Sequence, residues 1–362
     1  MQARTGAVSR MAGWVRAHWR LLLGLAVSAA SLYYLLRTVD PTHLWETFRR
    51  ANYLYFLPAA LLLVGINIAR ALRWRILIGP EPALGLRRLF SFVNIGYLFN
   101  NVLPAKAGEV VRAYLVGRVV RGGVGRAAST LVVERLLDLL TVVVLMVLLM
   151  PLVALPPWLR NAGWTFGALA VGGSVGLVVL ARVGPRGLDW VWRFIGRLPL
   201  VGHPRVKEAV AGLLEGFAVL TDLRVLGGVA LWSAVVWLGY AVFNYGLMLA
   251  FHLRLPFAAA ATVLCATGFS MVVPSSPGAV GPFEAAAVLA LSLFGVAESP
   301  ATAYAFGLHW FTNITLILYG LVGLRQEGVS FAHLRAGALP AASPLPAAGE
   351  EIAPRRAGAP DA

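Results

Sequence analysis

The sequence predicts an all-α, polytopic membrane protein with about six full spans and two re-entrant, broken-helix hairpins in an inverted-repeat arrangement. The first observation is composition: of 362 residues, 59% are hydrophobic and 13% are charged. Soluble domains carry roughly 45–50% apolar and about 25% charged residues, so this chain cannot cover itself with a polar surface. The composition therefore excludes soluble enzymes, disordered proteins and disulfide scaffolds.

Apolar runs of spanning length are the second observation. A helix needs about 20 largely apolar residues to cross the hydrocarbon core of a bilayer. The runs that meet this requirement are 20–37, 53–77, 127–150, 163–183, 225–250 and 302–324. The first run follows a basic N-terminus, as a signal peptide would. We interpret it as an uncleaved span because it continues past the small residues 28–30 to Leu36.

The third observation is the interruption of two more apolar segments. Residues 86–103 end at Pro104, and residues 258–297 are broken in the middle by the sequence PSSPG. Lys and Arg concentrate in cytoplasmic loops. Both flanks of the first segment are rich in Arg, whereas both flanks of the second are poor in charge. The first segment is therefore predicted to enter and return from the cytoplasm, and the second from outside. The alternative is that both cross, which gives about eight spans.

The chain is predicted to form one transmembrane domain, residues 20–325, in the cell (inner or plasma) membrane with both termini in the cytoplasm. Residues 1–19 form a basic cytoplasmic N-terminus. Residues 184–224 form a cytoplasmic loop, whose apolar residues recur on one face of an interfacial helix. Residues 326–362 are rich in Ala, Pro and Gly, which predicts a disordered cytoplasmic tail.

The excess of basic residues sets the orientation and does not indicate a nucleic-acid partner. The net charge is +15, and most of the basic residues fall in segments assigned to the cytoplasm. Arg70, Arg73 and Arg75, at the end of the second span, are expected to extend toward anionic lipid head groups. A single cysteine, Cys265, allows no intrachain disulfide. No metal-ligand spacing or nucleotide-binding motif is visible, so we expect no metal, no cofactor and no catalytic residues.

The two interrupted segments repeat each other. Residues 99–110 and 269–280 lie 170 positions apart (274 − 104 = 170) and share five identical residues of twelve. Three predicted spans separate them, and an odd number of spans inverts the second copy. Paired broken helices in an inverted repeat indicate a transporter's binding site; the alternative is that Pro and Gly merely kink ordinary spans. The residues expected to break the helices are Pro104, Gly108, Pro274, Pro277, Gly278 and Gly281.

Polar side chains within and beside these apolar segments form the candidate site. They are Asn100, Asn101, Lys106, Glu109, Arg112, Glu134, Arg135, Asp138 and Glu284. A charge at mid-membrane costs about 2.5–3.5 kcal/mol, so such residues usually face a cavity or a partner. We predict that Lys106, Arg112 and Arg135 hold an anionic head group, while the carboxylates balance them or carry a coupling ion. The alternative is a buried ion-pair network that locks the helices together.

Four short motifs follow one another along the chain. They are Arg73-Trp74, NVLPAKAGEVVR (101–112), VERLLD (133–138) and PSSPGAVGPFEA (274–285). In this order they resemble the flippase-like family, which is the transmembrane region of lysylphosphatidylglycerol synthases and its stand-alone relatives. The resemblance covers roughly residues 20–325 and implies lipid translocation without naming the lipid. The synthases carry an aminoacyl-transferase domain after this region; about 35 residues follow it here, so synthase activity is not expected.

These observations together predict a transporter that moves an anionic or isoprenoid-linked lipid between leaflets. One alternative is an integral membrane enzyme on lipid-linked substrates, with Glu109, Glu134 or Asp138 as acid or base. Another is a membrane scaffold subunit of a lipid or cell-envelope biosynthetic pathway. The expected partners are membrane lipids with an anionic head group. A membrane-protein partner or a homo-oligomer is left open.

Overall fold

The structure is a computed structural model, and all regular elements in its described part are helices. The described residues are 26–33, 35, 37, 40–103, 107–154, 157–183, 192–193, 221–271 and 276–329. The predicted all-α fold is thus confirmed. Pro104, Lys106 and Pro274 lie outside these residues, as does most of the predicted loop at 184–224 with its interfacial helix. The predicted tail beyond residue 329 also lies outside them.

The helices follow the order of the predicted spans, with extra short helices at the two breaks and near the N-terminus. They are α2 (Pro41–Arg50), η1 (Tyr53–Tyr55), α3 (Phe56–Ile78), α4 (Leu86–Val102), α5 (Ala107–Gly117), α6 (Gly123–Leu149), α7 (Pro157–Val183), α10 (Leu223–Ala250), α11 (Phe257–Ser270), η3 (Pro277–Ala279), α12 (Pro282–Ser292) and α13 (Glu298–Glu327). Residues 26–33 are also helical. The helix α13 ends at Glu327, two residues past the predicted boundary at residue 325.

Several helices have the length and surface of membrane spans. Among the described residues, three helical stretches are both long and apolar enough by composition, namely η1 with α3, α10 and α13. α6 and α7 contain 27 residues each, which is about 40 Å at 1.5 Å per residue. Large apolar side chains such as Leu61, Leu231 and Leu318 are exposed. Such an apolar exterior is suited to lipid tails, so the chain is a multi-pass membrane protein.

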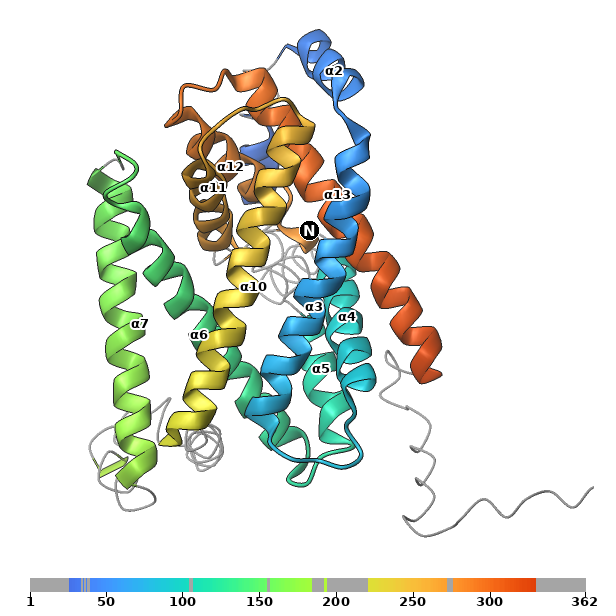
Figure 1. The fold of residues 1–362 in the computed structure, drawn as a ribbon, viewed down its shortest axis with the longest axis vertical. Coiled ribbons are helices and arrows are strands. Elements are labelled where there is room, and N and C mark those ends of the chain that lie inside the picture. Colours follow the sequence, from blue (N-terminus) through green and yellow to red (C-terminus); the bar gives the residue numbers. More distant parts are fainter. Residues whose placement is uncertain are drawn as a thin grey trace, which may run out of the picture.

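The two interrupted segments form helical hairpins in opposite halves of the molecule (Figure 1). α4 and α5 have 17 and 11 residues and pack against each other in one half. α11 and α12 have 14 and 11 residues and pack against each other in the other half. The first hairpin closes tightly, since a Cβ atom on Gly108 would overlap the carbonyl oxygen of Gly96. The predicted pair of broken helices is therefore present, with each hairpin turning back within its own half.

Contacts between the helices repeat in the two halves of the chain. α3 to α6 pack each on the next, and α10 to α13 do the same. Across the halves, α4 packs on α13 and α11 packs on α6, which are equivalent contacts if α3 corresponds to α10. α3 and α10 are antiparallel, since Asn52 N, beside the start of α3, donates to Ala250 O at the end of α10 (2.8 Å). These contacts agree with the predicted inverted repeat, in which α6, α7 and α10 separate the hairpins.

Ion pairs tie the helix ends together beside the first hairpin. Arg126, near the start of α6, contacts Glu81 with 3.0 Å between Nη1 and Oε1. Arg88, near the start of α4, contacts Glu327 at the end of α13 with 3.1 Å between Nε and Oε2. The two ends of the first hairpin thus lie at the same end of the molecule as the end of α13.

Candidate functional site

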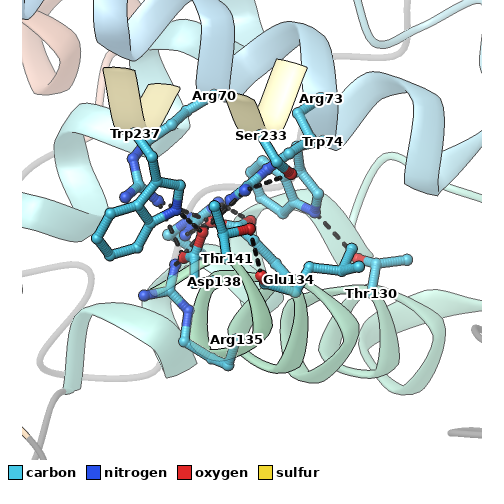
Figure 2. A network of polar contacts seen from close by, with 12 residues as sticks. Arg70, Arg73, Trp74, Thr130, Glu134, Arg135, Asp138, Thr141, Ser233 and Trp237 are labelled. Carbon is cyan, nitrogen blue, oxygen red and sulfur yellow. Dashed lines mark hydrogen bonds and ion pairs between the residues drawn. The ribbon is translucent and has the colours of Figure 1, made fainter. Parts of the chain in front are cut away.

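Seven charged side chains meet where α3, α5 and α6 come together, and we call them the charged cluster. They are Arg70 and Arg73 of α3, Glu109 and Arg112 of α5, and Glu134, Arg135 and Asp138 of α6. Figure 2 shows the part of the cluster formed by α3 and α6. Spacings of three and four residues place several of these side chains on one helix face. The first hairpin contributes because the chain turns back after α4 and brings α5 against α6.

Glu134 lies at the centre of the charged cluster and is fully buried. Its Oε2 accepts from Arg112 Nη2 at 2.9 Å, and its Oε1 accepts from Arg135 Nη2 at 2.6 Å. Arg70 Nη1 and Arg73 Nη2 lie 3.4 and 3.5 Å from the same Oε1. One carboxylate therefore faces four guanidinium groups from three helices.

Asp138 joins the charged cluster to α10. Its Oδ1 lies 2.8 Å from Arg73 Nη1, and its Oδ2 lies 3.3 Å from both Arg70 Nη1 and Arg135 Nη2. Trp237 of α10 donates from its indole N–H to Asp138 Oδ1 at 3.2 Å. The aspartate therefore links α3, α6 and α10 through one side chain (Figure 2).

The charged cluster carries more positive than negative charge. Four arginines face three carboxylates, which leaves a net charge of +1 when the carboxylates are ionised (4 − 3 = 1). Arg keeps its proton in proteins, so this surplus is permanent. Arg135 is the accessible member, with 44% of its side chain exposed, whereas Arg73 is completely buried. An anion could therefore reach the cluster at Arg135.

Several polar atoms of the charged cluster have no hydrogen-bond partner within the described residues. These atoms are the Nε of Arg70, Arg73 and Arg112, Nη2 of Arg73, and Oε2 of Glu109. Arg73 Nη2 still has its ion-pair contact with Glu134 Oε1 at 3.5 Å, which leaves three guanidinium Nε donors without a polar contact in the described part of the chain. A buried donor without a partner costs about 1–3 kcal/mol. The cluster therefore has more hydrogen-bond donors than acceptors, in addition to its surplus of positive charge. Both properties favour an acceptor-rich, negatively charged ligand.

Aromatic rings surround the arginines of the charged cluster. The Trp74 ring centroid lies 4.2 Å from Arg112 Cζ, and the Trp74 indole N–H donates to Thr130 Oγ1 at 3.0 Å. Tyr97 of α4 and Tyr240 of α10 flank Arg70, with their ring centroids 5.9 and 5.4 Å from its Cζ. Faces of aromatic rings attract guanidinium groups, and Arg stacks well on them. The rings thus hold the arginines in place without neutralising their charge.

The second broken helix has its own polar centre. Glu284 of α12 and His309 of α13 are buried, and Glu284 Oε1 lies 2.6 Å from His309 Nδ1. The other ring nitrogen of His309, Nε2, lies 2.7 Å from the carbonyl oxygen of Gly278. Glu284 Oε2 accepts from the amide N–H of Gly281 at 2.7 Å. Gly278 and Gly281 both have positive φ values, 73° and 98°, which L side chains rarely adopt.

The two breaks approach each other near the middle of the molecule. A Cβ atom on Gly278 would lie 3.9 Å from Asn101 Oδ1 and 3.5 Å from Asn313 Nδ2 of α13. Asn100 turns instead to its own hairpin, where its Oδ1 accepts from the amide N–H of Gly108 at 2.9 Å. Asn100 therefore caps the start of α5, while Asn101 faces the second break.

The structure brings together five of the residues predicted for the site and places the others at the breaks. Those in the charged cluster are Glu109, Arg112, Glu134, Arg135 and Asp138. Asn100, Asn101 and Glu284 lie at the two breaks, and Lys106 lies outside the described residues. The ion-pair network considered as the alternative is present. Contact between these residues and a head group stays a prediction.

The expectation that Arg70 and Arg73 extend toward lipid head groups is wrong. Both are buried, Arg73 completely, and both contact Asp138. Arg70 lies two turns before the end of α3 at Ile78, and at this depth α6 presents the carboxylates of Glu134 and Asp138 to it. Arg70 and Arg73 are three residues apart in an apolar helix, and this spacing places both on one helix face. That pattern could have indicated that both side chains point into the protein. His309 was also missed, because it lies 25 positions after Glu284 and no local pattern indicates their contact.

Comparison with known proteins finds similar membrane proteins. The family profile described as "Lysylphosphatidylglycerol synthase TM region" matches residues 21–320. Two UPF0104 membrane proteins of Methanothermobacter thermautotrophicus are similar, each 24% identical. One match covers 77% of this chain and 87% of the relative, and the other covers 75% and 83%. No solved structure shows significant similarity to the chain.

A third relative carries an enzyme name. The glycosyltransferase AglD of Haloferax volcanii is 26% identical over 86% of this chain and 55% of its own length. Nearly half of that relative therefore has no counterpart in the alignment. The similarity is therefore limited to about half of that relative but extends over most of this chain.

Proposed function

The chain belongs to the family of the lysylphosphatidylglycerol synthase transmembrane region, and we propose that it moves an anionic lipid between the leaflets of a membrane. The observation that carries the proposal is the charged cluster, in which four arginines face three carboxylates at the first broken hairpin. Charged residues at membrane depth are costly, and by default they indicate a substrate or ion pathway. A surplus of guanidinium donors is suited to a phosphate group, which has several acceptor oxygens.

The lipids that fit this chemistry share a phosphate or diphosphate beside an apolar tail. Phospholipids with an anionic head group and isoprenoid-linked phosphates both meet this description. The head group would enter beside Arg135, the exposed member of the charged cluster. The tail would stay along the apolar exterior, where residues such as Leu61 and Leu231 are exposed. Only the head group then needs a polar path.

The arrangement of the two hairpins supports a mechanism in which access to the charged cluster alternates between the two sides of the membrane. They occupy opposite halves of the bundle and meet at their breaks, where Gly278 approaches Asn101. In transporters with inverted repeats, paired broken helices lie at the substrate site, and one repeat moves against the other. By the same logic, access to the charged cluster would alternate between the two sides. The basic end, with Arg88 and Arg126, would face the cytoplasm together with both termini, in the cell membrane.

Lipid retention tests this proposal. The protein is purified in mild detergent, and the bound lipids are identified by mass spectrometry. Wild type is expected to retain phosphate-containing anionic lipid, and Arg135→Gln is expected to lose most of it. Arg50→Gln, an exposed arginine paired with Glu46 on α2, is the control and should retain lipid as wild type does. Equal retention of neutral and anionic lipid by all three would refute the site.

A second candidate is suggested by the relative named as a glycosyltransferase. In this reading the chain is the membrane part of a lipid-linked biosynthetic reaction, as an enzyme or as a scaffold for a partner. Glu109 is the carboxylate to test, because its Oε2 lacks a hydrogen-bond partner within the described residues. Product formation from a lipid-linked donor, abolished by Glu109→Gln, would support an enzyme. Copurification of a stoichiometric partner without any lipid movement would support a scaffold.

A further inference from the structure

The imidazole ring of His309 lies between two oxygen acceptors. Its Nε2 is 2.7 Å from the carbonyl oxygen of Gly278, and its Nδ1 is 2.6 Å from Glu284 Oε1. A carbonyl oxygen has no proton to give, so Nε2 must donate. The Nδ1 contact then needs a second proton, either on Nδ1 or on the carboxyl oxygen. The other carboxyl oxygen is already occupied, because it accepts from Gly281 N–H.

Counting protons gives the state of this pair. An imidazolium with a carboxylate and a neutral imidazole with a carboxylic acid both contain two protons and have no net charge. With one proton fewer, a lone pair of the ring faces a lone pair of an oxygen at one of the two contacts. A net negative charge would also be left where Glu284 is 0% and His309 is 2% exposed. Buried charge without a partner is strongly unfavourable, so the observed geometry is that of the two-proton pair.

The surroundings of the pair offer no described group that could replace the missing proton. Within the described residues, the ion pair of His309 is with Glu284. Other polar groups described at the break are uncharged. They include Asn101 of α4, Asn313 of α13, the Ser276 hydroxyl, and the Ser28 hydroxyl, which accepts from Ser276 N–H at 2.9 Å. Lys106 of the first break lies outside the described residues.

The pair holds the second break in place. Gly278 is in η3, between the short helices α11 and α12, and its carbonyl is fastened to α13 by His309. Phe283 of α12 stacks on the His309 ring with 4.2 Å between centroids. Gly278 is also the residue that approaches Asn101 of the first break. Release of this carbonyl would therefore loosen the point where the two breaks meet.

We propose that Glu284 and His309 form a proton-binding site that fastens the second broken helix to α13. Loss of one proton to water leaves one N–H hydrogen for two contacts. The charge-assisted bond to the Glu284 carboxylate is the stronger of the two and keeps it, so the contact between His309 and Gly278 breaks. The break then becomes free to move. If the chain moves lipid as proposed above, this step links proton release to access at the site. That link rests on the proposed function, whereas the proton-binding site does not.

The variant Glu284→Gln can keep the hydrogen bonds of the protonated pair but has no acid proton to lose. The Gln side-chain carbonyl can accept from Gly281 N–H, and its amide can donate to His309 Nδ1. His309 then donates from Nε2 to Gly278, so every contact is kept with a neutral ring and no proton can leave the acid. The variant therefore imitates the fastened state at every pH. Glu298→Gln is the matched control, because Glu298 is an exposed glutamate at the start of α13.

Cysteine labelling tests the proposal directly. Cys265 is buried and is first replaced by Ala, and Ser276→Cys then places one thiol at the break. The rate of maleimide labelling is measured from pH 5 to pH 10 with and without Glu284→Gln, and the ratio of the two rates cancels the ionisation of the thiol. We expect the ratio to rise at least about fivefold with pH, and to do so with Glu298→Gln as well. A ratio that stays constant over the whole range overturns the proposal.

Stability provides a second measurement that needs no introduced cysteine. The folded pair holds two protons, whereas in the unfolded chain at neutral pH an ionised Glu284 and a neutral His309 hold one. The ratio of unfolded to folded protein should therefore rise with pH, by up to about tenfold per unit. This rise should be present in wild type and Glu298→Gln and absent in Glu284→Gln. Equal pH dependence in all three contradicts a proton-binding site, even if lipid transport is demonstrated. The rise without any lipid movement contradicts only the proposed function.

Discussion

Arg112 and Glu134 form a double contact between the first hairpin and α6. Arg112 Nη2 lies 2.9 Å from Glu134 Oε2, and Arg112 Nη1 lies 3.4 Å from Oε1. Both side chains are buried, and the Arg112 guanidinium also faces the Trp74 ring. This pair holds α5, the short helix after the first break, against the spanning helix α6. The charged cluster therefore depends on the chain turning back between α4 and α5.

Removal of the Glu134 carboxylate is expected to destabilise the protein strongly. Glu134→Gln leaves four buried or half-buried arginines with one central acceptor fewer, and breaking a buried pair from one side costs about 3–5 kcal/mol. The free energy of unfolding in detergent measures this cost. Glu46→Gln, which removes an exposed pair on α2, should change it little.

A double substitution should recover part of that loss. Arg112→Met together with Glu134→Gln removes one unpaired guanidinium and keeps an apolar side chain of similar length. We expect the double variant to be more stable than Glu134→Gln alone. If the double variant is less stable than the single one, Arg112 is not held mainly by Glu134.

The close approach of α4 and α5 predicts that any side chain at position 108 destabilises the hairpin. A Cβ atom there would overlap Gly96 O and come within 2.6 Å of Asn100 Oδ1, so Gly108→Ala forces the hairpin apart and costs about 1–3 kcal/mol. Gly65, within α3, has no atom within 4 Å of its Cβ position. Gly65→Ala should therefore be neutral or slightly stabilising. Equal thermal stability of both variants would contradict the packing of the hairpin.

Side-specific labelling tests whether the first hairpin returns to its own side. Arg87→Cys, at the exposed start of the hairpin, and Arg121→Cys, at an exposed position after it, are made singly with Cys265→Ala. A membrane-impermeant maleimide added to intact cells should label neither, because both are expected in the cytoplasm. Glu298→Cys, at the opposite end of the bundle, should be labelled. If positions 87 and 121 respond differently, the hairpin crosses the membrane and the inverted repeat is refuted.

Much of the fold could be predicted from the sequence, because membrane helices are apolar throughout and Pro and Gly interrupt them. The broken segments and their opposite placement followed from the 170-residue repeat and the position of Arg. The side-chain partners could not be predicted in the same way. Arg70 has the sequence position of a residue that extends to the membrane surface, and its partners Glu134 and Asp138 are 64 and 68 positions away in the sequence. The contact of His309 with Glu284 depends on the packing of α13 on α12, which no local pattern specifies.

Lipid movement in proteoliposomes tests the central claim most directly. Reconstituted protein is given fluorescent phosphatidylglycerol or a labelled polyprenyl phosphate, with phosphatidylcholine as the neutral control. Wild type should move at least one anionic lipid much faster than phosphatidylcholine. Arg135→Gln should be at least about tenfold slower, since a hydrogen bond to a charged group contributes about 1.5–3 kcal/mol, and Arg50→Gln should match wild type. Rates for both anionic lipids that equal the neutral rate, or an Arg135→Gln rate equal to wild type, would contradict the account.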